Sequence, residues 1–172
     1  RDNGSGYCWG SNGMGQLGIG SYSSTATNNT PQLITGTGLG GSGWGTLGIG
    51  HNNSCGIRTN GSLRCWGLYS LTANNKILNY PTPQPVSTSG VTGWNWTQIT
   101  GAGRFSAYGL RDNGAGWGWG NVIVFNGNGP IAYDPTQGDL VTYSVSGTSW
   151  IDLSSGYNAA CGIRNDGTLY CW

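Results

Sequence analysis

Glutamate is absent from the 172 residues, and lysine and histidine occur once each, as Lys76 and His51. Seven basic residues stand against six acidic ones, which leaves a formal net charge of +1. Scattered charge of this kind cannot form the clustered basic face that a nucleic-acid or membrane-surface binder needs. Acid and base catalysis draws mostly on His, Glu and Lys. The composition therefore argues against nucleic acid as a partner and predicts a protein that is not an enzyme and has no cofactor.

Long apolar runs and helix-forming residues are also scarce. No segment approaches the roughly 18 apolar residues of a membrane span, and none resembles a signal peptide, so we expect no membrane insertion. Glycine instead fills 34 of 172 positions, without the every-third-residue period of collagen. Hydrophobic residues, at 36%, suffice for a core. The sequence therefore predicts an all-β fold of short strands and turns.

An internal repeat organises the chain. The segment 56–67 recurs at 109–120 and again from residue 162, and 1–9 matches its second half. A repeat of a few tens of residues predicts a propeller or a solenoid. The aligned landmarks are Arg1, Arg58, Arg111 and Arg164, each eight residues before Trp9, Trp66, Trp119 or Trp172, and a second set of Trp44, Trp96 and Trp150.

We expect one repeat domain over residues 1–172. Its units are approximately 10–66, 67–119 and 120–172, and residues 1–9 form the final strand of a preceding blade. Spacings of 53 to 57 residues between the aligned arginines suit a blade of four short antiparallel strands. About three blades are present, as an open fragment or as part of a larger ring.

Paired cysteines accompany the repeat. A hairpin through Thr59-Asn60-Gly61, with glycine at a left-handed third position, places Cys55 directly opposite Cys65, and the same register places Cys161 opposite Cys171. In the middle unit both positions change together, to Tyr108 and Gly118. Joint replacement favours two disulfides over buried free thiols. Disulfides in turn favour an extracellular or cell-surface location.

Cys8 has no partner in this register. Its partner would lie two positions before Arg1, which suggests a fragment of a longer repeat protein whose Cys8 partner lies outside the chain. An intermolecular bridge or a free thiol at Cys8 is the alternative.

The first unit resembles the regulator of chromosome condensation repeat. The resemblance rests on Cys8-Trp9-Gly10, Gly15-Gln16-Leu17-Gly18, Thr30-Pro31, Cys55-Gly56-Ile57-Arg58 and Asn60-Gly61. It is strongest to the secreted, cysteine-bearing, alpha-tubulin-suppressor-like branch. The later units keep the hairpin and the tryptophans but lose Gly-Gln-Leu-Gly. A kelch propeller fits less well, because it expects a glycine doublet in each blade and only Gly40-Gly41 provides one.

The resemblance implies a ring that is typically seven-bladed. About three blades cannot close alone, so further blades complete the ring, copies assemble, or the blades stack as an open solenoid. It also implies a structural use for His51. We expect no catalytic residue and no metal site, because there is no second histidine and no acidic cluster. Asp112 and Asp166 are expected to bond within their turns, and the recurring arginine to pair with backbone or turn oxygens.

Seven of the nine tryptophans occupy repeat positions, where packing between blades is the expected role. Trp94 and Trp117 are the remaining two, and they are the candidate platform for a glycan ligand. Five glycosylation sequons begin at Asn3, Asn28, Asn52, Asn60 and Asn95. Asn28, in a polar run, is expected to be the most accessible, and Asn60, at a hairpin tip, the next.

The leading functional hypothesis is a non-enzymatic extracellular or cell-surface module that serves as a structural or adhesive scaffold. Its partners would be proteins, either copies of itself or further blades of the same chain, in an assembly or filament. The first alternative is a glycan-binding, lectin-like propeller. A third is a regulator of the nucleotide-exchange type, which the cysteine framework and the near-zero charge disfavour.

Overall fold

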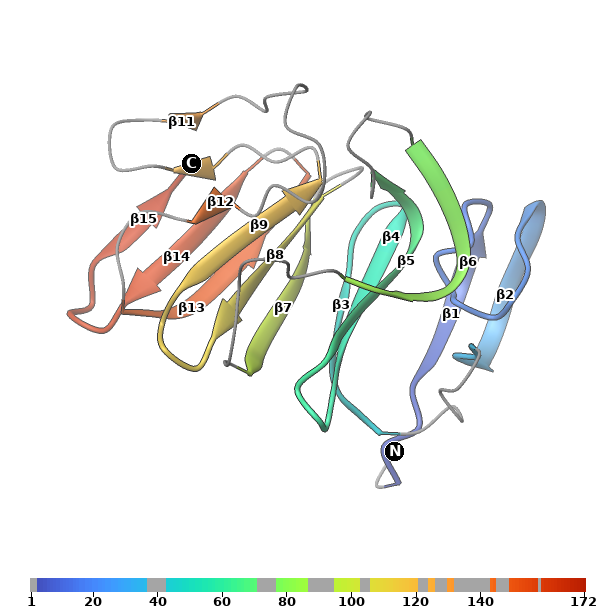
Figure 1. Cartoon of the computed structure of the whole chain (residues 1–172). Coiled ribbons are helices and arrows are strands. Elements are labelled where there is room, and N and C mark those ends of the chain that lie inside the picture. Colours follow the sequence, from blue (N-terminus) through green and yellow to red (C-terminus); the bar gives the residue numbers. More distant parts are fainter. Residues whose placement is uncertain are drawn as a thin grey trace.

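The computed structural model describes residues 3–36, 43–70, 77–86, 95–102, 106–120, 124–125, 130–131, 143–144, 149–157 and 159–172 (Figure 1). Every regular element within these ranges is a β-strand, and the all-β expectation is confirmed. No helix in the described part of the chain is long and apolar enough to cross a membrane.

The strands are β1 (Tyr7–Asn12), β2 (Ser23–Leu33), β3 (Trp44–Ile49), β4 (Asn53–Arg58), β5 (Leu63–Ser70), β6 (Ile77–Pro85), β7 (Trp96–Ala102), β8 (Ser106–Arg111), β9 (Gly116–Gly120), β10 (Val124–Phe125), β11 (Pro130–Ile131), β12 (Tyr143–Ser144), β13 (Trp150–Ser155), β14 (Ala160–Arg164) and β15 (Leu169–Cys171).

Four antiparallel sheets follow one another along the chain, and Figure 1 shows them side by side in this order. The first sheet is β1 and β2; the second is β3-β4-β5-β6. The third has the order β7-β8-β9-β12, and the fourth is β13-β14-β15. Strands β10 and β11 form a separate pair. The second and third sheets thus have the four strands expected of a blade.

The hydrophobic core lies between the sheets rather than within any one of them. The clusters are Cys8, Leu17, Ile34, Trp44 and Trp66 between the first and second sheets; Cys55, Ile57, Leu63, Cys65, Val86, Trp96, Ile99 and Ala107 between the second and third; and Tyr108, Leu110, Trp150, Leu153 and Ala160 between the third and fourth. Each sheet therefore depends on its neighbour for burial.

The opening strands of successive sheets approach closely. Strand β7 lies against β3 and β4 on one side and against β13 on the other. A Cβ added to Gly48 would lie 2.9 Å from the Gly101 nitrogen, so only glycine permits this approach of β3 to β7. The contact of β7 with β13 is polar, since Gln98 Nε2 donates to the Leu153 carbonyl at 3.1 Å.

The hairpin register predicted from the sequence is confirmed. Cys55 pairs with Cys65, and Gly56 and Ile57 pair with Arg64 and Leu63. The third loop residue, Gly61, has φ +79°, a left-handed conformation that favours glycine. Equivalent glycines close the later hairpins, Gly114 at +76° and Gly167 at +82°.

The sheets are offset from the sequence units. Unit 10–66 supplies β2 to the first sheet and strands β3 and β4 to the second, so one unit spans two sheets. The unit boundaries and the assignment of residues 1–9 describe the sequence, and they stay predictions.

Candidate functional site

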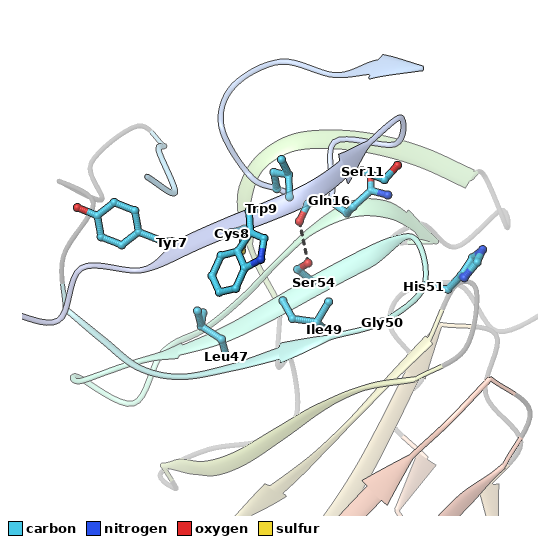
Figure 2. Close-up of a pocket in the computed structure, with 11 residues that line it drawn as sticks. Tyr7, Cys8, Trp9, Ser11, Gln16, Leu47, Ile49, Gly50, His51 and Ser54 are labelled. Carbon is cyan, nitrogen blue, oxygen red and sulfur yellow. Dashed lines mark hydrogen bonds between the residues drawn. The ribbon is translucent and has the colours of Figure 1, made fainter. Parts of the chain in front are cut away.

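A pocket of about 330 Å³ opens between β1 and β3 (Figure 2). Tyr7, Cys8 and Trp9 of β1 line one side, and Leu47 and Ile49 of β3 line the other. The remaining lining residues are Ser11, Gln16, Leu17, Gly50, His51 and Ser54. Two large apolar side chains at its rim are open to solvent, Trp9 at 63% and Ile49 at 59% exposure.

The Gly15-Gln16-Leu17-Gly18 segment closes one end of this pocket. The Gln16 carbonyl accepts a bond from Trp66 Nε1 at 2.9 Å and another from Ser54 Oγ at 2.7 Å. Gly18 packs against the Trp66 indole, because a Cβ added to it would lie 2.7 Å from Trp66 Nε1. The motif that is most specific in the sequence thus fastens the first sheet to the second.

Cys8 lies buried in the pocket wall. It is the free cysteine of the chain, and burial raises the pKa of its thiol to about 11. The thiol is therefore protonated at neutral pH and is a poor nucleophile.

The four other cysteines form two disulfides. Cys55 bonds to Cys65 across β4 and β5, and Cys161 bonds to Cys171 across β14 and β15. Tyr108 and Gly118 face each other at the matching place in the third sheet.

His51 is exposed in the turn between β3 and β4. Its ring makes a T-shaped contact with the ring of Tyr157, from the turn between β13 and β14, with centroids 5.7 Å apart. The turns of two sheets separated by the third therefore meet. Among the described residues, no three His, Cys or Asp side chains gather where they could hold a metal ion.

Asp112 and Asp166 lie at hairpin turns and accept hydrogen bonds from different segments. Asp112 Oδ2 accepts a bond from the Asn95 backbone nitrogen at 3.3 Å. Asp166 accepts from both the hydroxyl and the backbone nitrogen of Thr168, and these bonds lower the pKa of its carboxyl group. Asp166 therefore bonds within its turn as expected, whereas the bond to Asp112 comes from Asn95, the residue before β7, and not from its own turn.

The recurring arginines lie over tryptophan rings, a contact that the sequence did not predict. The guanidinium carbon of Arg58 is 5.1 Å from the Trp44 ring centroid. The same contact measures 4.7 Å for Arg111 on Trp96 and 4.9 Å for Arg164 on Trp150. In each sheet the two residues are register partners on the first two strands. The signal was available, because both residues recur with the repeat.

Burial divides the repeat tryptophans. Trp44, Trp66, Trp96 and Trp150 are buried between sheets, as the packing prediction requires. Trp172 is half-buried against Tyr108. Trp9 differs, because no described segment covers it as the Gln16 loop covers Trp66. The side chain of Trp119 lies outside the described residues.

Of the two residues of the expected glycan platform, the structure describes Trp117. Trp117 is half-buried and packs against the cluster between the second and third sheets, with its indole nitrogen enclosed. Its neighbours Trp96 and Tyr108 are buried as well. Trp94 lies outside the described residues. A packed indole of this kind does not present a face for stacking on a sugar.

The sequon asparagines differ in exposure. Asn3, Asn60 and Asn95 are exposed, whereas Asn28 and Asn52 are half-buried. Asn28 lies within β2 and pairs with Gly10. Asn60 is therefore more accessible than Asn28, which is the opposite of the order expected from the sequence. The Asn60 side-chain oxygen accepts a bond from the Ser62 nitrogen at 3.1 Å and so orders the hairpin tip.

Two segments match two family models, both described as the Regulator of chromosome condensation (RCC1) repeat: residues 3–39 match one and residues 150–172 match the other. The first segment contains β1, β2 and the Gln16 loop, and the second is the fourth sheet.

Solved structures show the same fold at low sequence identity. Human WBSCR16 is similar at TM-score 0.75 and 18% identity, over 99% of this chain and 43% of that one. Prp20p from Saccharomyces cerevisiae, described with its binding to Gsp1p and histones, is similar at TM-score 0.71 and 16% identity. The match covers 96% of this chain and 40% of that one. Yeast RCC1 (Prp20) bound to Kap60 is similar at TM-score 0.66 and 15% identity. The match covers 96% of this chain and 39% of that one. The chain spans about two fifths of the solved chains that it matches. Its sheets are the blades of a β-propeller.

Proposed function

This chain is a member of the regulator of chromosome condensation repeat family, and on that premise we propose that it is a non-enzymatic scaffold that associates with copies of itself. The role is structural or adhesive, at the cell surface or outside the cell. The observation that carries the proposal is an apolar face on the fourth sheet whose counterparts in the other sheets are buried.

Equivalent positions make the comparison direct. Ile57 and Leu63 pair across β4 and β5, are each 4% exposed, and are covered by the third sheet. Ile163 and Leu169 pair in the same way across β14 and β15 and are 36% and 64% exposed. Adjacent apolar side chains that are exposed here and buried at the equivalent positions suit an interaction surface. The partner that suits it is another sheet of the same repeat.

The hairpin turns support the same partner. The Gly4 and Gly114 carbonyls each accept a bond at 3.0 Å from the tryptophan that opens the following sheet, Trp44 and Trp150 respectively. Gly167 occupies the equivalent turn, and a Cβ placed there would meet nothing within 4 Å. The turn of the fourth sheet thus has the same position that, in the turns of the first and third sheets, accepts a hydrogen bond from the next sheet.

Three further considerations support the proposal. Two disulfides suit an oxidising compartment. The charge composition, with one histidine, one lysine and no glutamate, provides few groups for catalysis. Prp20p, which shares the fold, binds the proteins Gsp1p and histones, and this fits a protein as the partner class.

The test is the sedimentation of the purified chain over a concentration series, with one variant and a matched control. Ile163→Asp places a charge on the face whose counterparts are buried. Ile151→Asp alters a 59% exposed isoleucine of the same sheet, whose counterparts Gly45 and Thr97 stay exposed although neighbouring sheets are present.

We expect Ile163→Asp to raise the dissociation constant roughly tenfold to a hundredfold, because a buried isoleucine contributes about 1.5–3 kcal/mol. Ile151→Asp should leave it unchanged. A chain that stays monomeric at all concentrations, or equal effects of the two substitutions, would contradict the proposal.

A further inference from the structure

The hairpin turn between β4 and β5 carries a sequence motif that the proposed scaffold does not use. Asn60 lies at the tip of this turn and is followed by Gly61 and Ser62, which makes the tip a glycosylation sequon. Asn60 and Ser62 are both exposed. The turn thus presents both residues that define a sequon at the surface of the second sheet.

The hydrogen bonds of the Asn60 side chain are made by its oxygen. Oδ1 accepts one bond from the Ser62 backbone nitrogen at 3.1 Å and another from Ser62 Oγ at 2.7 Å. No hydrogen bond from Asn60 Nδ2 is found within the described residues. The amide nitrogen, which is the atom that carries an N-linked glycan, is therefore available at the surface.

Two backbone bonds within residues 58–62 hold the turn. Gly61 N donates to the Arg58 carbonyl at 2.8 Å, and Arg58 N donates to the Ser62 carbonyl at 2.8 Å. These bonds join residues that are close in sequence, so the turn can form in the nascent chain before the sheets pack. The same geometry is therefore present in the unfolded precursor and in the folded chain.

Two of the other sequons begin at half-buried asparagines, Asn28 and Asn52. Asn28 lies within the paired strand β2. Ser54, the hydroxyl residue of the Asn52 sequon, is 1% exposed and donates to the Gln16 carbonyl at 2.7 Å. Neither sequon presents both of its defining residues at the surface.

The two remaining sequons differ from the Asn60 sequon at their hydroxyl residues. Thr97, in the Asn95 sequon, donates its hydroxyl to the Leu110 carbonyl at 3.1 Å rather than to the asparagine. Ser5, in the Asn3 sequon, is half-buried. Asn60 is therefore the asparagine that combines exposure, an exposed hydroxyl residue and a hydroxyl bonded to its own side chain.

We propose that Asn60 is the attachment site of an N-linked glycan. The donor is an oligosaccharide carried on a lipid diphosphate. Asn60 Nδ2 forms a bond to C1 of the first sugar, the bond from C1 to the diphosphate breaks, the lipid diphosphate leaves, and Nδ2 loses one proton. The proposal rests on the location proposed above, at the cell surface or outside the cell, because glycans of this class are attached to secreted proteins.

The repeat supplies matched controls, because two other hairpin turns have the same side-chain bond without a sequon. Asn113 Oδ1 accepts a bond from the Ala115 nitrogen at 3.0 Å. Asp166 Oδ1 accepts one from the Thr168 nitrogen at 2.9 Å. Asn113 and Asp166 are both exposed. One substitution completes the sequon in each turn, Ala115→Ser in the third sheet and Asp166→Asn in the fourth.

The experiment maps the attachment site on the chain purified from its natural source. Peptide N-glycosidase in H₂¹⁸O releases the glycan and converts the asparagine that carried it into aspartate labelled with ¹⁸O. Peptide masses then locate the label. We expect the label at Asn60, and none at Asn28, Asn52 or Asn95.

Four variants produced in the same cells sharpen the result. Ser62→Ala keeps Asn60 but removes the hydroxyl, and it should abolish the label. Ser62→Thr keeps a hydroxyl and should retain the label. Ala115→Ser and Asp166→Asn should each add a label, at positions 113 and 166 respectively, because their turns match the turn at Asn60.

The outcomes distinguish this proposal from the one on which it rests. An unlabelled Asn60 in chain recovered from outside the cell overturns the glycan and leaves the scaffold standing. A label at Asn60 on a chain that stays monomeric in sedimentation supports the glycan and contradicts self-association. A label that persists in Ser62→Ala, or one that appears at neither introduced sequon, contradicts the role of the turn.

Discussion

At the scale of single residues, glycine decides where an indole can lie. Gly56 faces Trp44, and an added Cβ would stand 2.6 Å from the ring; Gly162 faces Trp150 at 2.7 Å. The repeat shows both residue types at fixed spacing, but not that one makes room for the other. The contact of each arginine with its tryptophan was missed for a similar reason, because a linear alignment does not show which residues pair across strands.

Gly56→Ala is expected to destabilise the chain by about 1–3 kcal/mol, because the methyl group has no space beside Trp44. Gly45→Ala is the matched control. Its Cβ would meet the Ile57 carbonyl at 3.6 Å, an ordinary contact, and we expect little change. Denaturant unfolding of both variants measures the difference. Equal free energies of unfolding would contradict the packing described here.

Cys8 makes stability depend on pH in the alkaline range. The folded chain holds the thiol proton up to about pH 11, whereas the ordinary pKa is 9.0. Unfolding therefore releases a proton between these values, and the contribution of Cys8 is complete below pH 9 and is lost as the pH rises to about 11. Unfolding midpoints of the monomer should fall more steeply with pH for the wild type than for Cys8→Ala. Parallel curves would contradict the burial of this thiol.

At the scale of elements, the hairpin was the part most readily predicted. Its turn glycine, its register and its cysteines all follow from local geometry, and the sequence repeats them. Strand β2 was harder, because its polar residues resemble a loop and predict an exposed Asn28. Pairing with β1 decides its conformation.

Replacing Cys55 and Cys65 together with alanine is expected to cost about 2–3 kcal/mol from the lost cross-link, with a further loss from the cavity. Both cysteines are fully buried between the second and third sheets. The Cys161–Cys171 disulfide closes a loop of equal length, but Cys171 is exposed, so its replacement leaves no comparable cavity. Thermal unfolding of the monomers should therefore show the larger decrease for the first pair. A larger decrease for the second pair would contradict the assigned burial.

At the scale of the whole molecule, the sheets are stabilised from one to the next, as in other repeat proteins. The repeat in the sequence predicted this architecture and the approximate number of blades. It did not predict the pocket or the exposure of Trp9, because these depend on which segment covers a sheet, and covering segments are distant in sequence. Within the described residues, the face of the fourth sheet that carries Ile163 and Leu169 corresponds to a face that is buried between the second and third sheets.

Amide hydrogen exchange of the chain, below and above its association concentration, tests most directly whether copies cover this face. We predict that exchange slows above that concentration in the peptide that covers β15, because a second copy would cover the exposed Leu169. The peptide that covers β4 should exchange equally at both concentrations, because β4 pairs on both sides already. Equal exchange of the β15 peptide at the two concentrations would contradict the self-association proposed for this chain.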